Sequence, residues 1–287
     1  MNYVDAHVHV WTPDIDQHPL ADGFRKEGMK PPSFTPEELF QHCRRRGVER
    51  IVLIQMSFYR FDNSYMLDMM KLHQDERGPV FGAVAIIDVN ADHPDGEMRR
   101  LQQVGVRGFR IYGEEWRQGR SPDGYNRDWT AGPGFECMFH TAAETQQSMC
   151  MLIDPSELPA LDAMCRRFPA SPVVIDHLAR IGADGQIRDA DVKSLCDMAK
   201  HKDVKVKISA FYALGRKKPP HDDLVPMIRR VFDAFGPERL MWASDCPFQV
   251  DDETYEDSLS LVRDRLDFLS AGDRAWLLRK TAEQTFF

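Results

Sequence analysis

Short apolar runs recur along the chain, and polar segments with helical periodicity separate them. Eight runs read as strands that are covered on both faces, because they are almost wholly apolar and mostly rich in β-branched residues. They are YVDAHVHVW, RIVLIQM, PVFGAVAII, GVRGFRIY, SMCMLI, SPVVIDHL, DVKVKIS and ERLMWASD. A candidate helix follows each one, and this alternation predicts a parallel (β/α)8 TIM barrel in the α/β class. The alternative is a doubly wound open sheet, but the chain lacks the GxGxxG turn that such sheets often use for nucleotides.

The helix signals between the runs support the same architecture. Thr35 is a candidate N-cap, Pro36 takes the first helical position, and Glu38 completes a capping box. No Ser/Gly/Pro-rich linker or charge block divides the chain. We therefore expect one domain, residues 1–287, in which residues 271–287 form a C-terminal helical cap.

Composition and charge narrow the possible partners. The 287 residues include 37 Lys and Arg against 45 Asp and Glu, a net charge of -8 that argues against nucleic acid or an anionic membrane as a partner. Six cysteines without CxxC spacing fit free thiols in a reducing cytoplasm, and neither a signal-peptide pattern nor a membrane-length apolar run is present. We expect a soluble cytoplasmic protein, a monomer or homodimer, that binds a small molecule.

In a TIM barrel the active site lies at the C-terminal ends of the strands, so titratable residues late in each run are the candidates. Two long connections would overhang this face. They are TPDIDQHPLADGFRKEGMKPPS after the first strand and EEWRQGRSPDGYNRDWTAGP after the fourth.

The first run ends with two histidines, His7 and His9, whose side chains point to the same side of a strand. Asp5 shares that parity one step deeper, where it could support a histidine or simply terminate a hydrogen-bond network. Asp245 ends the eighth run, which neighbours the first strand in a closed barrel, so it should approach both imidazoles. A carboxylate and two imidazoles can bind a divalent ion or deprotonate a water. The alternative is a structural role for each residue: His7 and His9 as hydrogen-bonded core histidines, and Asp245 as the N-cap of a helix.

Other runs contribute further polar groups. His177 ends the sixth strand and could polarise a carbonyl, unless it is a structural histidine. Arg110 and Tyr112 share one face near the end of the fourth strand, where Arg110 could bind an oxyanion or pair with an acid inside the barrel. Lys205 and Lys207 share a face of the seventh strand. We interpret Lys207 first as part of a structural ion pair and only second as a catalytic group.

Taken together, DAHVHVW, VVIDHLAR and WASDCPF resemble the amidohydrolase superfamily. The chain is most similar to its amidohydrolase-related branch of barrel lactonases, which contains 2-pyrone-4,6-dicarboxylate lactonase and sugar-acid lactonases. FYRFDNSYML, GVRGFRI and DVKVKISAFY are similar to other segments of that branch. The resemblance therefore covers nearly the full chain.

The resemblance implies roles for individual residues. His7 and His9 would be the first-strand site histidines, His177 would assist the substrate carbonyl, and Asp245 would accept the proton of water. The residues that would line the substrate pocket are Arg110, Asn63, Tyr59 and Tyr112.

The chain departs from the metal-binding members of the superfamily. The fifth run, SMCMLIDP, has no histidine at its end, and Arg110 stands where a strand-four lysine is usual. Only His7, His9 and Asp245 remain as ligands, and three can suffice for a catalytic zinc. The sequence leaves two possibilities open: no cofactor, or one divalent metal such as zinc.

The leading hypothesis is a hydrolase that opens a small lactone, anionic or polyhydroxylated, with water activated by Asp245. An ester is more electrophilic than an amide and has a better leaving group, so it needs less Lewis-acid help. The alternative on the same fold is a metal-dependent non-oxidative decarboxylase of an aromatic or dienoic acid. A third hypothesis is a barrel that binds a ligand without turnover, which the convergence of several titratable groups disfavours.

Overall fold

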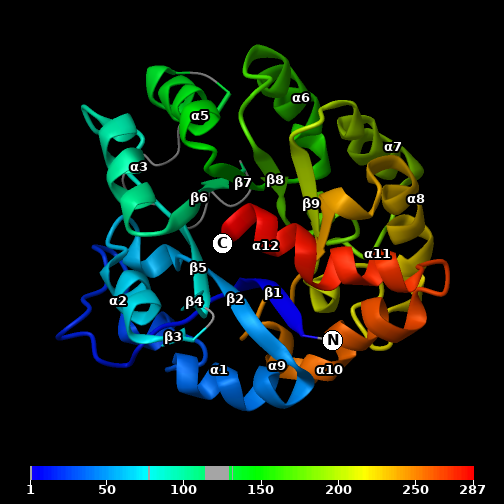
Figure 1. The fold of residues 1–287 in the computed structure, drawn as a ribbon, viewed down its shortest axis with the longest axis horizontal. Coiled ribbons are helices and arrows are strands. Elements are labelled where there is room, and N and C mark those ends of the chain that lie inside the picture. The colour runs from blue at the N-terminus through cyan, green and yellow to red at the C-terminus, as the bar shows by residue number, and fades with distance from the viewer. Residues whose placement is uncertain (1, 77, 114–128, 131) are drawn as a thin grey trace.

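The computed structural model describes residues 2–76, 78–113, 129–130 and 132–287, and it contains the expected barrel. Eight parallel strands pair in chain order, and helices surround them (Figure 1). The strands are β1 (Tyr3–Val8), β2 (Val48–Ile54), β5 (Phe81–Ala85), β6 (Val106–Tyr112), β7 (Ser148–Leu152), β8 (Val173–Ile175), β9 (Val204–Ile208) and β10 (Leu240–Trp242). Each coincides with one of the eight predicted runs. A short hairpin, β3 (Gln74–Asp75) with β4 (Gly78–Pro79), lies outside the barrel sheet.

The helices follow the strands around the ring. They are α1 (Pro36–Cys43), α2 (Ser64–Leu72), α3 (Pro94–Gln103), α5 (Pro133–Thr145), α6 (Leu158–Arg167), α7 (Asp189–Asp197), α8 (Val225–Phe235), α9 (Gln249–Asp252), α10 (Tyr255–Ser260), α11 (Ala271–Ala275) and α12 (Thr281–Phe286). Helix α1 begins with the predicted capping box, in which Thr35 and Glu38 each accept a hydrogen bond from the other's backbone N–H. Local sequence therefore determines where this helix starts.

The barrel closes through backbone contacts between β1 and the segment that follows β10. Val8 forms a parallel bridge with Cys246, and the His9 N–H donates to the Cys246 carbonyl at 2.8 Å. The Asp245 N–H donates to the His7 carbonyl at 2.9 Å. These bonds join the first strand to the segment after the last one. Residues from opposite ends of the sequence therefore lie side by side at the same end of the barrel.

Helix α12 lies across the N-terminal end of the barrel, near the centre of the ring (Figure 1). Its Ala282 and Phe286 pack against the side chains inside the barrel, and burying Phe286 stabilises the fold by roughly 2–3 kcal/mol. The helix passes so close to β5 that a Cβ on Gly82 would lie 2.6 Å from the Phe286 carbonyl oxygen. Apolar side chains fill this end of the barrel, so the active site is expected at the opposite end, where the strands have their C-termini.

The strand β1 is irregular, and this corrects the expected position of Asp5. Its pairing with β2 shifts register between Asp5 and Val8. Asp5 therefore does not lie beneath the histidines. Its carboxylate lies between the barrel and the helices, where it accepts hydrogen bonds from the Tyr255 hydroxyl of α10, the Ser244 N–H and the His7 N–H. Burial raises the pKa of Asp5 to about 6. Asp5 thus joins β1 to the segment after β10 and to α10.

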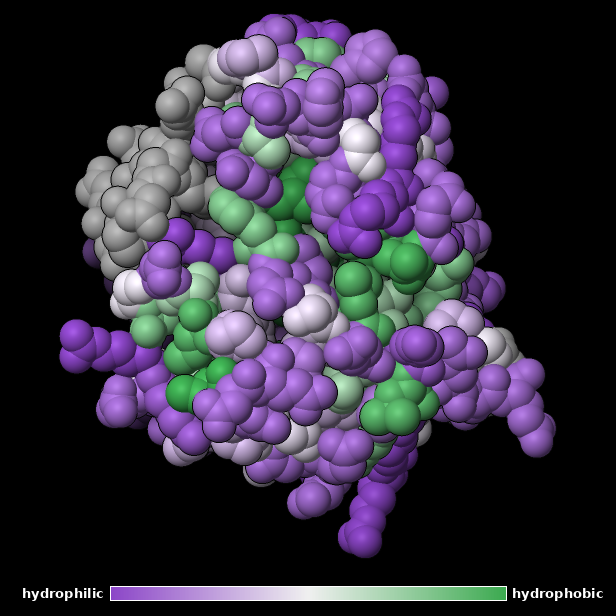
Figure 2. All heavy atoms as spheres, turned by 90° about the vertical axis from the view of Figure 1, so that its left-hand side faces the viewer, coloured by the Kyte–Doolittle hydropathy of each residue, from purple (hydrophilic) through white to green (hydrophobic). Residues whose placement is uncertain are grey.

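The surface over α2 and α3 carries apolar side chains in small separate groups among polar ones (Figure 2). Leu72 and Val104 are the most exposed large apolar residues in the described part of the chain. Scattered exposure of this kind is ordinary for a folded protein. All six cysteines are free thiols, and within the described ranges no helix combines the length and apolar character needed to cross a bilayer.

Candidate active site

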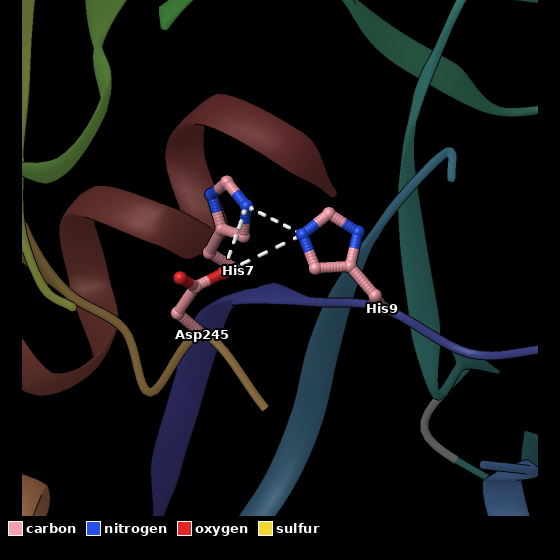
Figure 3. Close-up of side chains that lie close together, drawn as sticks. All are labelled: His7, His9 and Asp245. Atoms are coloured by element: carbon pink, nitrogen blue, oxygen red, sulfur yellow. Dashed lines mark hydrogen bonds and ion pairs between the residues drawn. The ribbon is translucent and has the colours of Figure 1, made fainter. Parts of the chain in front are cut away.

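His7 and His9 of the β1 end and Asp245 beyond β10 point toward one another at the C-terminal rim (Figure 3). The two Nε2 atoms lie 3.2 Å apart. Asp245 Oδ1 lies 3.5 Å from His7 Nε2 and 3.4 Å from His9 Nε2. All three side chains are buried. The structure thus brings together the three residues that the sequence placed at opposite ends of the barrel sheet.

Asp245 has a backbone conformation that is unusual for a residue with a side chain. Its φ is 66°, in the left-handed region, where a non-glycine residue costs roughly 1–2 kcal/mol. The hydrogen bond from its N–H to the His7 carbonyl helps to hold this conformation. Such residues concentrate at functional sites, where the surrounding structure fixes a strained backbone to direct a side chain.

A contact on the far side of its ring fixes the orientation of His9. Its Nδ1 lies 2.9 Å from the Ile54 carbonyl at the end of β2. A carbonyl can only accept, so in neutral His9 the proton is on Nδ1 and the lone pair of Nε2 faces His7 and Asp245. This is the arrangement in which a histidine binds a metal or accepts a proton.

His177 lies in a turn two residues after β8, rather than within the strand, and its φ is 52°. Its Nδ1 lies 2.8 Å from Ser209 Oγ and its Nε2 lies 3.9 Å from Asp245 Oδ2. Burial lowers the pKa of His177 to about 4, so the ring is neutral near pH 7. When Ser209 donates to Nδ1, the ring proton is on Nε2 and points into the site.

A buried charge cluster lies beside His7. Asp176 accepts from Arg110 Nη1 at 2.9 Å and pairs with Lys207 Nζ at 3.0 Å. The same two cations also reach His7: Arg110 Nη1 lies 3.2 Å from its Nε2, and Lys207 Nζ lies 3.2 Å from its Nδ1. The expected structural ion pair of Lys207 is therefore present, and Arg110 adopts the ion-pair alternative with a barrel acid. Sequence reasoning missed Asp176, although it stands directly before His177 in VVIDHLAR.

The cluster shifts the pKa values of its members. Burial opposes ionisation of Asp176, but the charges of Lys207 and Arg110 hold its pKa well below the usual range. Burial, followed by the charge of Lys207, lowers the pKa of His7 far below its usual value, so His7 is neutral. Burial also opposes ionisation of Asp245, yet the surrounding imidazoles, His177 foremost, lower its pKa. The site therefore combines an ionised Asp245 with neutral His7 and His177.

The residues predicted to bind substrate lie in different settings. The guanidinium of Arg110 lies over the Tyr112 ring, 5.4 Å from its centroid. The Tyr59 hydroxyl accepts from the Thr12 N–H at 3.3 Å, which links the loops after β1 and β2. Asn63 donates both amide hydrogens to the Phe61 and Ile86 carbonyls. These bonds join the loop after β2 to the residue after β5, and a substrate-binding role of Asn63 stays a prediction. The connection after β6 falls on residues 114–128, outside the described residues.

The spacing of the three rim residues fits a divalent metal. Zinc binds imidazole nitrogen at about 2.0–2.1 Å, so two ligands of a tetrahedral ion lie about 3.3 Å apart. The observed separations are 3.2, 3.4 and 3.5 Å. Asp245 Oδ1 is buried and accepts no conventional hydrogen bond from the described residues, as a ligand atom would. Arg110 competes for the lone pair of His7 Nε2, so binding an ion requires this guanidinium to give up that contact.

A family model described as amidohydrolase matches residues 4–287. The chain belongs to this family. It is 28% identical over 256 residues to L-fucono-1,5-lactonase of Burkholderia ambifaria, covering 85% of this chain and 80% of the relative. It is 26% identical over 247 residues to 4-sulfomuconolactone hydrolase of Rhizobium radiobacter, covering 85% and 75%. The resemblance to lactonases inferred from the motifs is confirmed.

The solved structures of the family share the fold. A crystal structure of an amidohydrolase from Burkholderia multivorans with bound zinc superposes with a TM-score of 0.78, at 21% identity and over 99% of both chains. At this identity the match demonstrates the barrel architecture alone. The zinc belongs to that protein, and the fit of a metal to this chain depends on the distances given above.

Proposed function

We propose that this protein hydrolyses a small lactone, with Asp245 as the base that activates water. The observation that carries the proposal is the meeting of ionised Asp245 with the imidazoles of His7, His9 and His177 at the barrel rim. The lactonase names of the family relatives support the substrate class. An anionic or polyhydroxylated ring suits a rim that is lined by hydrogen-bonding groups.

The chemistry follows from the positions of these groups. Asp245 Oδ1 removes a proton from water as the water oxygen attacks the lactone carbonyl carbon. The Nε2–H of His177 donates a hydrogen bond to the carbonyl oxygen and stabilises the oxyanion that develops there. The tetrahedral intermediate then breaks the ring C–O bond, and Asp245 returns its proton to the leaving alkoxide. The product is an open-chain hydroxy acid, which releases a proton to the solvent.

The lowered pKa of Asp245 makes this carboxylate a weak base for water when it acts alone. A base is most effective when its pKa lies near the working pH, whereas the pKa of Asp245 is lowered. The residues that would hold a divalent ion are His7, His9 and Asp245. When bound, such an ion supplies Lewis-acid polarisation and makes water more acidic. We propose that the site accepts a metal. Lactone opening that persists after chelation would show instead that the reaction needs no metal.

The decarboxylase alternative receives no support from the described site. It calls for a fuller ligand set, and β7 is followed by Asp154, which is paired with Arg180 at 2.8 and 3.0 Å. No histidine from this strand joins the site. We therefore retain lactone hydrolysis as the proposed function.

The experiment that tests the proposal is a screen of sugar-acid lactones and carboxylated lactones, with proton release followed by a pH indicator. Each substrate is measured with and without a chelator, and metal content is determined on the purified protein. Opening of at least one lactone supports the proposal. Inactivity on all lactones, together with chelator-sensitive release of carbon dioxide from aromatic acids, would replace it with the decarboxylase.

A further inference from the structure

Tyr212, which neither the motifs nor the expected site included, contacts the proposed base directly. Strand β9 ends at Ile208, Ala210 turns the chain with a φ of 54°, and a short 3-10 turn, Phe211–Ala213, follows. This turn carries the Tyr212 hydroxyl to Asp245 Oδ2, to which it donates at 2.7 Å. A hydrogen bond from a hydroxyl to an ionised carboxylate is among the stronger hydrogen bonds in proteins.

The two oxygens of Asp245 therefore differ in their surroundings. Oδ2 accepts from Tyr212 and lies 3.9 Å from His177. Oδ1 faces His7 and His9 and accepts no conventional hydrogen bond from the described residues. The last torsion of an aspartate side chain is broad and roughly two-fold, so an unrestrained carboxylate can turn within the site.

We propose that Tyr212 is a positioning residue whose hydroxyl holds the Asp245 carboxylate so that Oδ1 faces the space beside His7 and His9. The inference depends on the proposed function, because it presumes that Oδ1 is the atom that takes the proton of water. Tyr212 acts through Asp245 and needs no contact with the substrate.

The Tyr212 hydroxyl and the Asp245 carboxylate lie in close contact. Burial, followed by the negative charge of Asp245, raises the pKa of Tyr212 well above its usual value.

The chain offers a matched control for this contact. Tyr255 donates its hydroxyl to Asp5 Oδ2 at 2.6 Å, in a buried pair between the barrel and α10. Tyr255→Phe and Tyr212→Phe each remove one hydroxyl from a hydrogen bond to a buried aspartate. Only Tyr212 touches the proposed base, so the two variants separate positioning of the base from general stability.

The first test measures kcat, KM and melting temperature for the two variants on a lactone that the wild type opens. Loss of a group that orients a catalytic residue typically costs 10–100-fold in activity. We expect Tyr212→Phe to lower kcat by about 10–100-fold with KM changed less than about threefold. Tyr255→Phe should keep kcat within about twofold while lowering the melting temperature at least as much. An unchanged kcat in Tyr212→Phe, or an equal loss of kcat in both variants, would overturn the proposal.

The second test needs no turnover. Crystal structures of both variants are compared for the direction of the Asp245 carboxylate. We expect it to turn, or to occupy two orientations, in Tyr212→Phe and to stay fixed in Tyr255→Phe. If the carboxylate keeps its direction in Tyr212→Phe, positioning is refuted whatever the rates are. If it turns in a protein that opens no lactone, positioning stands and the proposed function is the part that is wrong.

Discussion

Replacing Lys207 with methionine removes one cation from the charge cluster at the base of the site. The Lys207 side chain is fully buried, and its ammonium lies 3.0 Å from Asp176 and 3.2 Å from His7. Methionine has a similar length and volume, so the cavity that remains is small. The dominant effect of Lys207→Met is to leave the buried Asp176 carboxylate with Arg110 as its remaining cationic partner.

The expected loss follows from the burial of that charge. Removing one partner of a buried ion pair typically costs 3–5 kcal/mol, because the other charge stays buried without full compensation. Since Arg110 remains 2.9 Å from Asp176, we expect the lower end, about 3 kcal/mol. At roughly 2–4 °C per kcal/mol for a large domain, the melting temperature should fall by about 6–12 °C.

Denaturant unfolding of wild type, Lys207→Met and Lys205→Met at pH 7 measures this effect. Lys205 lies on the same strand and face but is partly exposed, so Lys205→Met should cost no more than about 1 kcal/mol. The reasoning is refuted if Lys207→Met loses less than about 1 kcal/mol, or if both variants lose the same amount.

Three further predictions follow from the site. His177→Ala should lower kcat by about 10²–10³-fold with little change in KM, because it removes the proposed oxyanion donor; steady-state kinetics checks it. His9→Ala should weaken zinc binding at least tenfold in a competition with a chelating dye, because it removes one of three ligands. Buried His177, with its pKa lowered from 6.5 to about 4, loses about 3 kcal/mol of stability as pH falls from 6.5 to 4. Asp5, with its pKa raised from 3.8 to about 6, acts oppositely, since its stabilisation is lost as pH rises through 6. Because His7 also has a lowered pKa, the melting temperature should rise with pH over this range, and it should rise more steeply in Asp5→Asn than in the wild type.

The barrel could be predicted because its signals are local. Eight apolar runs and the helix signals between them, such as the capping box of Thr35, each lie within a short window of sequence. The approach of Asp245 to His7 and His9 could also be predicted, since closure of the barrel sheet forces the first and last strands together.

The rest of the site depends on contacts between distant segments. The register shift after Asp5 arises from pairing with β2, and no local pattern indicates it. Asp176 and Lys207 become partners only when β8 and β9 lie side by side. Tyr212 reaches Asp245 through the turn after β9, which periodicity does not describe. Sequence patterns therefore located the strands, while the partners of each polar group required the fold.

The most direct test of the account is the rate of lactone opening by Asp245→Asn. Initial rates of proton release are measured for wild type, Asp245→Asn and Asp251→Asn, an exposed control on α9. The account predicts that Asp245→Asn loses at least about 10³-fold in kcat while remaining folded, and that Asp251→Asn matches the wild type. An Asp245→Asn protein that retains a tenth or more of the wild-type rate would contradict the assignment of Asp245 as the base.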